Sequence, residues 1–300
     1  DSGDKDYYIS DLTVLIFDKS GNVIGSTTKK ASDLTPSSDG KFTIQVLTRA
    51  AQNCTVYAIA NALALNNNAT PFAGVATLSA LQSMVKTYAN ADDINTETCL
   101  LMMGKTDDNS FDTTTSGSAA AISLQRLASK IDFNFTVNND QTTGFPIVVD
   151  SYQLCNVPTS TLYQQSDFTN NPSMPSGSTS TSKYSSRGSI ASTAAGATQT
   201  YTCYVYTNTD ASNKTYLLIN AHSAVTGSGG STTVWNSVFR VNMPDIVKPN
   251  MHYTVNITIK GSANTSGVGG VITTYNAYPY FSGSILNPWG TNENRDLDLQ

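Results

Sequence analysis

The chain carries two aromatic, β-branched stretches near its C-terminal end. The first is His252-Tyr253-Thr254-Val255-Asn256-Ile257-Thr258-Ile259, and after a Gly-rich turn follows Val271-Ile272-Thr273-Thr274-Tyr275-Asn276-Ala277-Tyr278. Alternating β-branched and aromatic residues predict strands. A strand at a chain terminus either completes its own sheet or pairs with an exposed edge elsewhere. Whether this terminal strand pairs within its own sheet or with another edge therefore decides the function.

The composition favours a β-dominated protein large enough for two domains. The chain has 300 residues, of which 39% are hydrophobic and only 13% charged. Ser, Thr, Asn and Gly take the place of the missing charge, which suits pleated surfaces and tight turns. Chains of this length usually form more than one domain. We therefore expect an all-β fold with one or two short helices.

Net charge argues against two classes of partner. The formal charge is −5 and the sequence pI is near 4.9, and the longest basic run is Lys29-Lys30. A nucleic acid or an anionic membrane surface needs a basic face. No apolar run approaches the 18 residues that predict a membrane-spanning helix. The chain shows no signal-peptide pattern at Asp1, so we interpret it as a processed or trimmed product.

Strands alternate with turns through the first half of the sequence. We expect strands over 9–17, 41–47, 54–61 and 131–137, with Phe42, Ile44 and Val46 on one face of the second. One helix is predicted over 77–90, capped by Thr77, because apolar residues recur there at spacings of three and four. Turn residues at 138–144 then break the pattern.

The second half repeats this style. We expect strands over 147–149, 152–157, 200–206, 216–221 and 234–241, the last two joined by a hairpin across 227–230, and a long polar loop over 164–200. Short strands at this spacing predict β-sandwiches. The predicted domains are residues 1–144 and 145–267, followed by a C-terminal appendage at 268–300.

Few residues offer chemistry. His222 and His252 lack metal-ligand spacing, and no nucleophile elbow or phosphate loop is present, so we expect no catalytic residue, metal or cofactor. Paired aspartates at 92–93 and 107–108 are typical of solvated loops. The four cysteines, two in each half, form either one disulfide bridge per domain or four buried thiols.

Six segments in order resemble the fimbrillin family of Bacteroidia, the type V pilins. The family's opening strand and its Val-Tyr-Ala-Ile-Ala-Asn strand are similar to residues 9–21 and 56–61. Further matches fall at 126–131, 154–158, 204–208 and 246–261. The resemblance implies two tandem transthyretin-like Greek-key β-sandwich domains with an extra C-terminal strand. It also implies a lipid-modified precursor, exported and then processed by a protease at the cell surface or outer membrane.

The resemblance implies a role for the C-terminal stretch as well. In the family, removal of the first strand opens a groove in the N-terminal domain, which the C-terminal strand of a neighbouring subunit fills. Its partners would be other copies of this chain and related pilin subunits, in a head-to-tail filament with possible host or bacterial surface ligands. The residues predicted to form this polymerisation strand are Val271, Thr273, Tyr275, Ala277, Phe281 and Trp289.

A second interpretation is a tip or surface adhesin that binds glycans. Tyrosines at 184, 275, 278 and 280 would then stack on sugars, and the loop at 164–200 would carry specificity. A hydrolase would need a cleft with perturbed carboxylates, which nothing in the sequence indicates. The leading hypothesis is therefore a structural subunit of a fimbria, a stalk subunit rather than a tip or an anchor.

Overall fold

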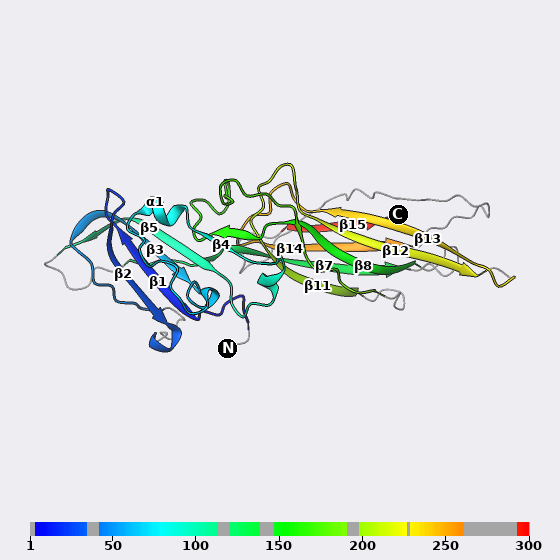
Figure 1. The fold of residues 1–300 in the computed structure, drawn as a ribbon, viewed down its shortest axis with the longest axis horizontal. Helices are drawn as coiled ribbons and strands as arrows, with labels where there is room; N and C mark the ends of the chain where they lie inside the picture. The colour runs from blue at the N-terminus through cyan, green and yellow to red at the C-terminus, as the bar shows by residue number, and fades with distance from the viewer. Residues whose placement is uncertain are drawn as a thin grey trace. The chain divides into compact units, whose positions relative to one another are not determined.

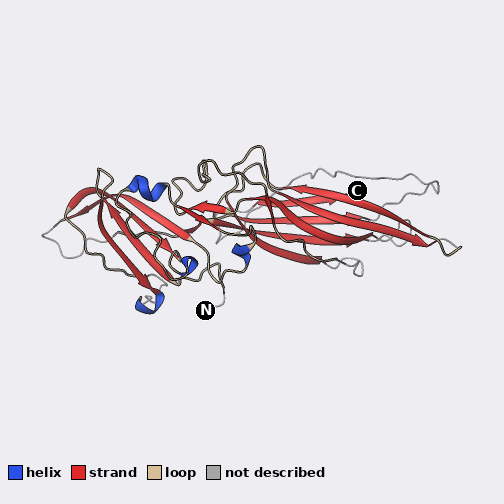
Figure 2. Ribbon diagram, in the orientation of Figure 1, coloured by secondary structure: helices blue, strands red, loops and turns tan. Residues whose placement is uncertain are grey.

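The computed structural model describes residues 4–34, 42–112, 120–138, 147–190, 198–226 and 229–260, together with the backbone of 293–299. The chain is almost entirely β-structure, as predicted (Figure 2). It divides into two compact units. Unit 1 comprises Asp1–Tyr88, Thr96–Ala128 and Ser160–Gly177, and unit 2 comprises Ala89–Asn95, Ser129–Thr159 and Ser178–Gln300.

Unit 1 is built on one five-stranded antiparallel sheet, in which β1 lies between β2 and β3 (Figure 1). A turn at Asp18–Asn22 joins β1 to β2, and Gly21 supplies its positive φ of 80°. The strands in sheet order are β2 (Val23–Lys30), β1 (Asp11–Phe17), β3 (Ala51–Ala60), β5 (Met102–Phe111) and β6 (Gln125–Arg126).

The predicted helix is much shorter than expected. Helix α1 (Leu78–Gln82) begins as predicted, because the Thr77 side chain accepts a hydrogen bond from the Ala80 backbone at 3.2 Å. It ends where the Ser83 hydroxyl bonds back to Ser79. The following residues form β4 (Val85–Thr87), which pairs with β9 (Ser160–Leu162). A partner 75 residues away in sequence thus overrides the helical periodicity in this stretch.

The strand expected at 41–47 does not join a ladder over its described residues 43–47. Among the described residues, Thr43–Leu47 pair with no strand, and isolated bridges occur only at the two ends of the segment, at Phe42 and at Thr48, which bridges to Gly25. Phe42, Ile44 and Val46 are half-buried and their neighbours are exposed, Leu47 to 95%. The alternation predicted from the sequence is therefore present without the backbone partners that a strand requires.

Unit 2 consists of two four-stranded sheets (Figure 1). The strands of the first, in sheet order, are β10 (Ser182–Lys183), β8 (Ile147–Val157), β12 (Tyr216–Thr226) and β13 (Thr232–Asn242). Those of the second are β11 (Thr198–Tyr206), β7 (Ala128–Asn138), β14 (His252–Lys260) and β15 (Glu293–Leu299). The predicted hairpin is confirmed as β12–β13, which pairs from Tyr216 opposite Asn242 to Thr226 opposite Thr232.

Aromatic side chains from both sheets fill the core of unit 2. The rings of Phe135 on β7 and Tyr152 on β8 are 5.0 Å apart, and Tyr152 meets Tyr201 of β11 edge-on at 5.1 Å. Phe133 stacks on Tyr201 with centroids 6.1 Å apart, and the Arg187 guanidinium lies 5.3 Å from the centroid of the Tyr201 ring. These contacts between sheets make unit 2 a sandwich.

Strand β7 belongs to unit 2, although the sequence pattern suggested that it closes the first domain. It lies between β11 and β14, and it pairs with β14 in parallel register from Lys130 opposite His252 to Asn138 opposite Lys260. Residues 139–146, where the boundary at 144 was expected, lie outside the described residues. Local sequence cannot identify a parallel partner more than 110 residues away, because the pairing is set by tertiary packing.

The cysteines and the long polar loop are now defined in part. All four cysteines are buried free thiols, so the alternative of four buried thiols is confirmed over that of one disulfide bridge per domain. The loop at 164–200 contains β10 and part of β11. Tyr184 in this loop is 2% exposed, and its hydroxyl donates to the backbone oxygen of Tyr204. This burial removes Tyr184 from the set of residues that could stack on a sugar.

Candidate functional site

The predicted polymerisation strand lies outside the described residues. This holds for all six of its side chains: Val271, Thr273, Tyr275, Ala277, Phe281 and Trp289. Downstream of them, the backbone of β15 pairs in parallel with β14, with Glu293 opposite Tyr253 and Leu299 opposite Ile259. The end of the appendage is thus part of a sheet of unit 2. The opposite half of the predicted interaction is an acceptor in the N-terminal domain, and the structure describes most of the corresponding sheet of unit 1.

Apolar side chains of β1 and β3 lie on both faces of the unit 1 sheet. One face carries Leu15, Phe17, Tyr57 and Ile59, which are each at most 2% exposed, and the Gln82 side chain of α1 hydrogen-bonds to Tyr57 there. We call the other the seam face. It carries Leu12, Val14, Ile16, Val56, Ala58 and Ala60, all of them buried, at between 0% and 6% exposed. The apolar side chains of the central strands β1 and β3 are therefore buried on both faces of the sheet.

Two extended segments meet the seam face, each at a glycine. On β2, a Cβ added to Gly25 would lie 2.8 Å from the Leu47 carbonyl oxygen, closer than real Cβ atoms approach. On β5, a Cβ at Gly104 would overlap the Ser123 carbonyl oxygen and lie 2.6 Å from Ile122 Cγ2. Register places Gly25 opposite Ile16 and Gly104 opposite Ala58, so both glycines share the seam face. Close approach of backbone is what glycine permits.

Both segments alternate half-buried and exposed side chains as strands do, but residues 43–47 and 120–124 belong to no ladder of the described chain. Residues 120–124 pair in no ladder within the described part of the chain, as is also true of 43–47. Half-buried Ala120, Ile122 and Leu124 alternate with exposed Ala121 and Ser123. The two segments flank β1 and β3, because the sheet order is β2-β1-β3-β5. At a strand spacing of ~4.8 Å, β2 and β5 are about 14 Å apart, enough for a further strand between the two segments.

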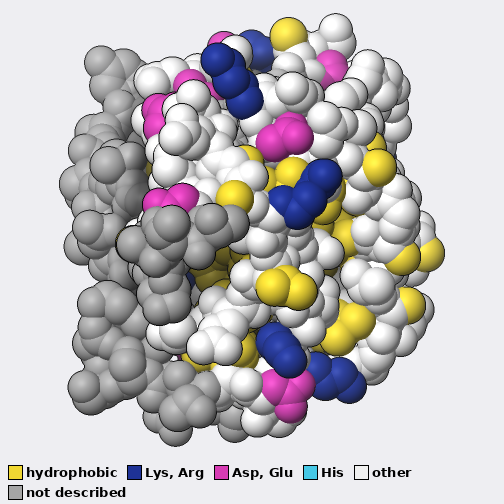
Figure 3. Space-filling model, turned by 90° about the vertical axis from the view of Figure 1, so that its left-hand side faces the viewer, with side chains coloured by type: hydrophobic (Ala, Val, Ile, Leu, Met, Phe, Trp, Pro, Cys, Tyr) yellow, Lys and Arg dark blue, Asp and Glu magenta, His cyan; other side chains and the backbone are white. Residues whose placement is uncertain are grey.

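We call this arrangement the seam: the seam face with its flanking segments 42–48 and 120–124. Figure 3 views the molecule from the side of β1, β2 and β3, and shows hydrophobic side chains reaching the surface between polar ones. The sequence analysis identified the alternation at 42–46 and missed Gly25, Gly104 and the segment 120–124. A glycine within each of two strands was the signal that could have found them.

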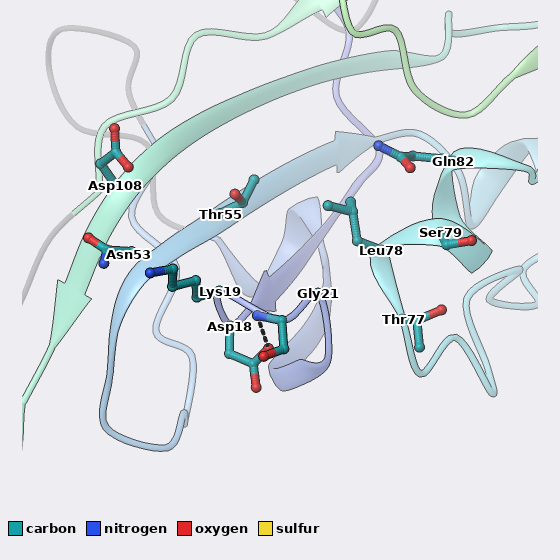
Figure 4. Close-up of a pocket in the computed structure, with 11 residues that line it drawn as sticks. Asp18, Lys19, Gly21, Asn53, Thr55, Thr77, Leu78, Ser79, Gln82 and Asp108 are labelled. Carbon is teal, nitrogen blue, oxygen red and sulfur yellow. Dashed lines mark hydrogen bonds between the residues drawn. The ribbon is translucent and has the colours of Figure 1, made fainter.

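A separate hollow of about 1010 Å³ opens beside the β1–β2 turn (Figure 4). It is lined mainly by polar side chains, among them Asp18, Asn53, Thr55 and Asp108. Asn53 and Asp108 have positive φ (55° and 59°) where the β3–β5 register shifts. Asp18 accepts hydrogen bonds from the backbone N–H groups of Asn22 and Ser20, which lower its carboxyl pKa. The hollow brings together no nucleophile and base.

The histidines make structural pairs with aspartates. His222 Nδ1 lies 2.7 Å from Asp150, and His252 Nε2 lies 2.6 Å from Asp132. Within the described residues, no three His, Cys, Asp or Glu side chains gather in a way that could hold a metal ion. Over the same ranges, no helix is both long and apolar enough to cross a membrane.

A scan against protein-family models matches residues 2–282 to the family described as fimbrillin-A associated anchor proteins Mfa1 and Mfa2. The match covers nearly the whole chain, both units included. A search of curated proteins finds no match.

Solved structures share the fold at low sequence identity. A putative cell adhesion protein from Parabacteroides distasonis aligns with a TM-score of 0.64 at 16% identity, over 88% of this chain and 83% of that one. Another, from Bacteroides eggerthii, aligns at 0.58 and 18%, over 98% and 92%. A fimbrial assembly protein from Parabacteroides distasonis aligns at 0.52 and 16%, over 84% of each chain. At these identities the likeness concerns the fold.

Proposed function

The chain belongs to the family of fimbrillin-A associated anchor proteins Mfa1 and Mfa2 and is a fimbrial protein, and we propose that it polymerises by strand addition. In this proposal, residues 271–289 of one copy enter the seam of the next. The family implies a location at the cell surface and association with other fimbrial subunits, and it suggests a structural rather than a catalytic role. We further propose a stalk subunit, exported as a lipoprotein precursor to the outer membrane and processed there.

The observation that carries the proposal is the seam. Within segments 42–48 and 120–124, residues 43–47 and 120–124 present backbone groups that no strand of the described chain pairs with, on both sides of an apolar face. An inserted strand would pair the N–H and C=O groups of one edge with one of these segments, and its alternate side chains would cover the seam face. Burying three side chains of the size of Val271, Tyr275 and Phe281 contributes roughly 5–8 kcal/mol before ordering costs.

The direction of assembly follows from where donor and acceptor lie. The donor strand is C-terminal and the seam is in unit 1, so each copy offers one of each. Such a contact is heterologous: it joins different surfaces of the two copies and repeats along a fibre if the rotation between copies does not close a ring. Copies of this one kind of subunit would therefore be enough to extend a filament.

Truncation at two points tests the proposal. Deleting residues 268–300 should leave folded monomers that fail to enter fibres when mixed with the intact protein. Deleting only 293–300 is the matched control, because it removes β15 and retains the predicted donor. Electron microscopy and sedimentation measure incorporation. Normal fibres from the longer deletion would refute strand donation by this segment.

The adhesin interpretation receives less support. Tyr184 is buried against Tyr204, and the other three tyrosines proposed to stack on sugars, at 275, 278 and 280, lie outside the described residues. Glycan-array binding by the intact monomer, lost when those three are replaced by alanine, would favour the adhesin. A silent array would count against it.

A further inference from the structure

The chain passes between its two units five times. The crossings follow Tyr88, Asn95, Ala128, Thr159 and Gly177. Two tandem domains need a single crossing. The excess arises from two short segments, each built into one unit while the sequence on both sides of it belongs to the other. We call residues 160–177 the unit 1 strap and residues 89–95 the unit 2 strap.

The unit 1 strap is built in by a strand and an aromatic contact. Its β9 pairs with β4, and beyond it the Tyr163 N–H donates to the Met84 carbonyl at 3.2 Å. The Tyr163 ring packs edge-on against Phe72 with centroids 5.4 Å apart, and burial raises the pKa of this tyrosine to about 12. Thr161 of β9 is buried as well, with 2% of its surface exposed. This strap is therefore part of the unit 1 core.

The unit 2 strap is held by two side-chain acceptors and one apolar anchor. Asn95 Oδ1 accepts from the Tyr204 N–H at 2.8 Å, and Asp92 Oδ2 accepts from the Ser185 N–H at 3.0 Å. Between them Ile94, in the 3₁₀-helix η3 (Asp93–Asn95), is 2% exposed. Both acceptors bind backbone groups of unit 2, one on β11 and one beside β10.

We infer that the two straps make the units unfold as one cooperative block. If unit 2 were unfolded, unit 1 would have to place its strap at the end of a disordered connection through residues 129–159. If unit 1 were unfolded, unit 2 would face the same problem through residues 96–128. Closing a disordered loop costs entropy, and the folded state of either unit removes that cost for the other.

This inference goes beyond polymerisation and does not depend on it. A subunit whose halves unfold independently extends under load in two steps. One whose halves are strapped reciprocally loses its fold only in a single larger event. Both straps belong to the isolated monomer, so their effect on unfolding is independent of whether the seam accepts a strand.

Hydrogen exchange along a urea series tests it. Amides of β3 report on unit 1 and amides of β12 on unit 2. In the intact protein both sets should lose protection at one urea midpoint. Tyr163→Ala weakens the unit 1 strap and Asn95→Ala the unit 2 strap. Each should separate the two midpoints by about 0.5–1 M urea.

The control weakens unit 1 without touching a strap. Ile59→Val removes a methylene from a fully buried side chain of β3, and should lower a midpoint that the two units still share. Two midpoints in the intact protein would overturn the inference. So would strap variants that lower one shared midpoint as Ile59→Val does. Asn95→Ala deletes only a side-chain amide, so it keeps the test available if Tyr163→Ala does not fold.

Discussion

His252 Nε2 on β14 lies 2.6 Å from Asp132 Oδ2 on β7, and the other oxygen of Asp132 accepts a hydrogen bond from Thr202 on β11. One carboxylate thus links three adjacent strands of unit 2. Both members of the pair are about four-fifths buried, with side-chain exposures of 20%. Burial raises the pKa of Asp132, but the hydrogen bonds from His252 and Thr202 lower it by more, so it falls below the ordinary 3.8.

A pKa depressed in the folded state makes stability depend on pH. The contribution of Asp132 is present above the pKa of the unfolded chain and is lost as pH falls through the lower pKa of the folded state. We expect Asp132→Asn to lower the free energy of unfolding by about 1–2 kcal/mol at pH 7. The deficit should shrink toward pH 3, as measured by urea denaturation at both values.

Asp150→Asn is the matched control for this prediction. Asp150 pairs with His222 at nearly the same distance, 2.7 Å, but the two side chains are 44% and 31% exposed. Exposed pairs contribute about 0–1 kcal/mol. If Asp132→Asn and Asp150→Asn have the same effect at pH 7, burial of the first pair does not strengthen it.

Replacing Gly104 by a residue with a Cβ should destabilise unit 1, because another segment lies over this glycine. The carbonyl of Ser123 occupies the place of a Cβ, and backbone cannot move aside as a flexible side chain can. We expect Gly104→Ala to destabilise unit 1 by about 1–3 kcal/mol. Gly188→Ala serves as the control, since a Cβ there meets no atom within 4 Å and its φ is not positive. Equal urea midpoints for the two variants would show that residues 120–124 do not pack against β5.

Asn61 should be among the most sensitive polar residues of unit 1. It is fully buried with φ of 69°, and its side chain donates to the carbonyls of Tyr8 and Leu100 and accepts from the Ser10 N–H. We expect Asn61→Gly, which tolerates the backbone conformation, to cost about 2–4 kcal/mol through lost hydrogen bonds alone. Asn61→Ala should cost more, because alanine adds backbone strain. A glycine variant as stable as the parent in urea would show that the conformation, not the bonding, selects asparagine.

The four thiols should react only when the protein unfolds. All are buried, and burial raises the pKa of each, that of Cys99 to about 11. Because the thiolate is the reactive form, we expect negligible reaction with a disulfide reagent at pH 8 in the native state, and four equivalents in denaturant. Fewer than four equivalents under non-reducing conditions would reveal a bridge. A fast native phase would reveal an exposed thiol.

Local patterns predicted the strands better than their partners. The alternation at 131–137 and 252–259 identified β7 and β14, and the turn residues at 227–230 identified the β12–β13 hairpin. Nothing local indicated that β7 pairs in parallel with β14, because such a pair is joined through other elements rather than a turn. The helix predicted over 77–90 failed for the same reason, since β9 competes for residues 85–87.

The candidate site was predictable only in part. The alternation of Phe42, Ile44 and Val46 is visible in the sequence, but the lack of backbone partners for 43–47 depends on what the rest of unit 1 places beside them. The importance of Gly25 and Gly104 depends on a segment crossing each of them. Sequence shows which side chains share a face, and only the fold shows what covers that face.

The parallel pairing of β15 with β14 bears on how a donor strand would leave its subunit. In the sequence, residues 271–289 lie between β14 and β15, and these two strands are hydrogen-bonded to each other. While β14 and β15 remain paired, a donor strand from this segment would enter another copy as a loop and not as a free C-terminal end. Threading it into another copy as a simple tail first requires seven residues, Glu293–Leu299, to peel from β14.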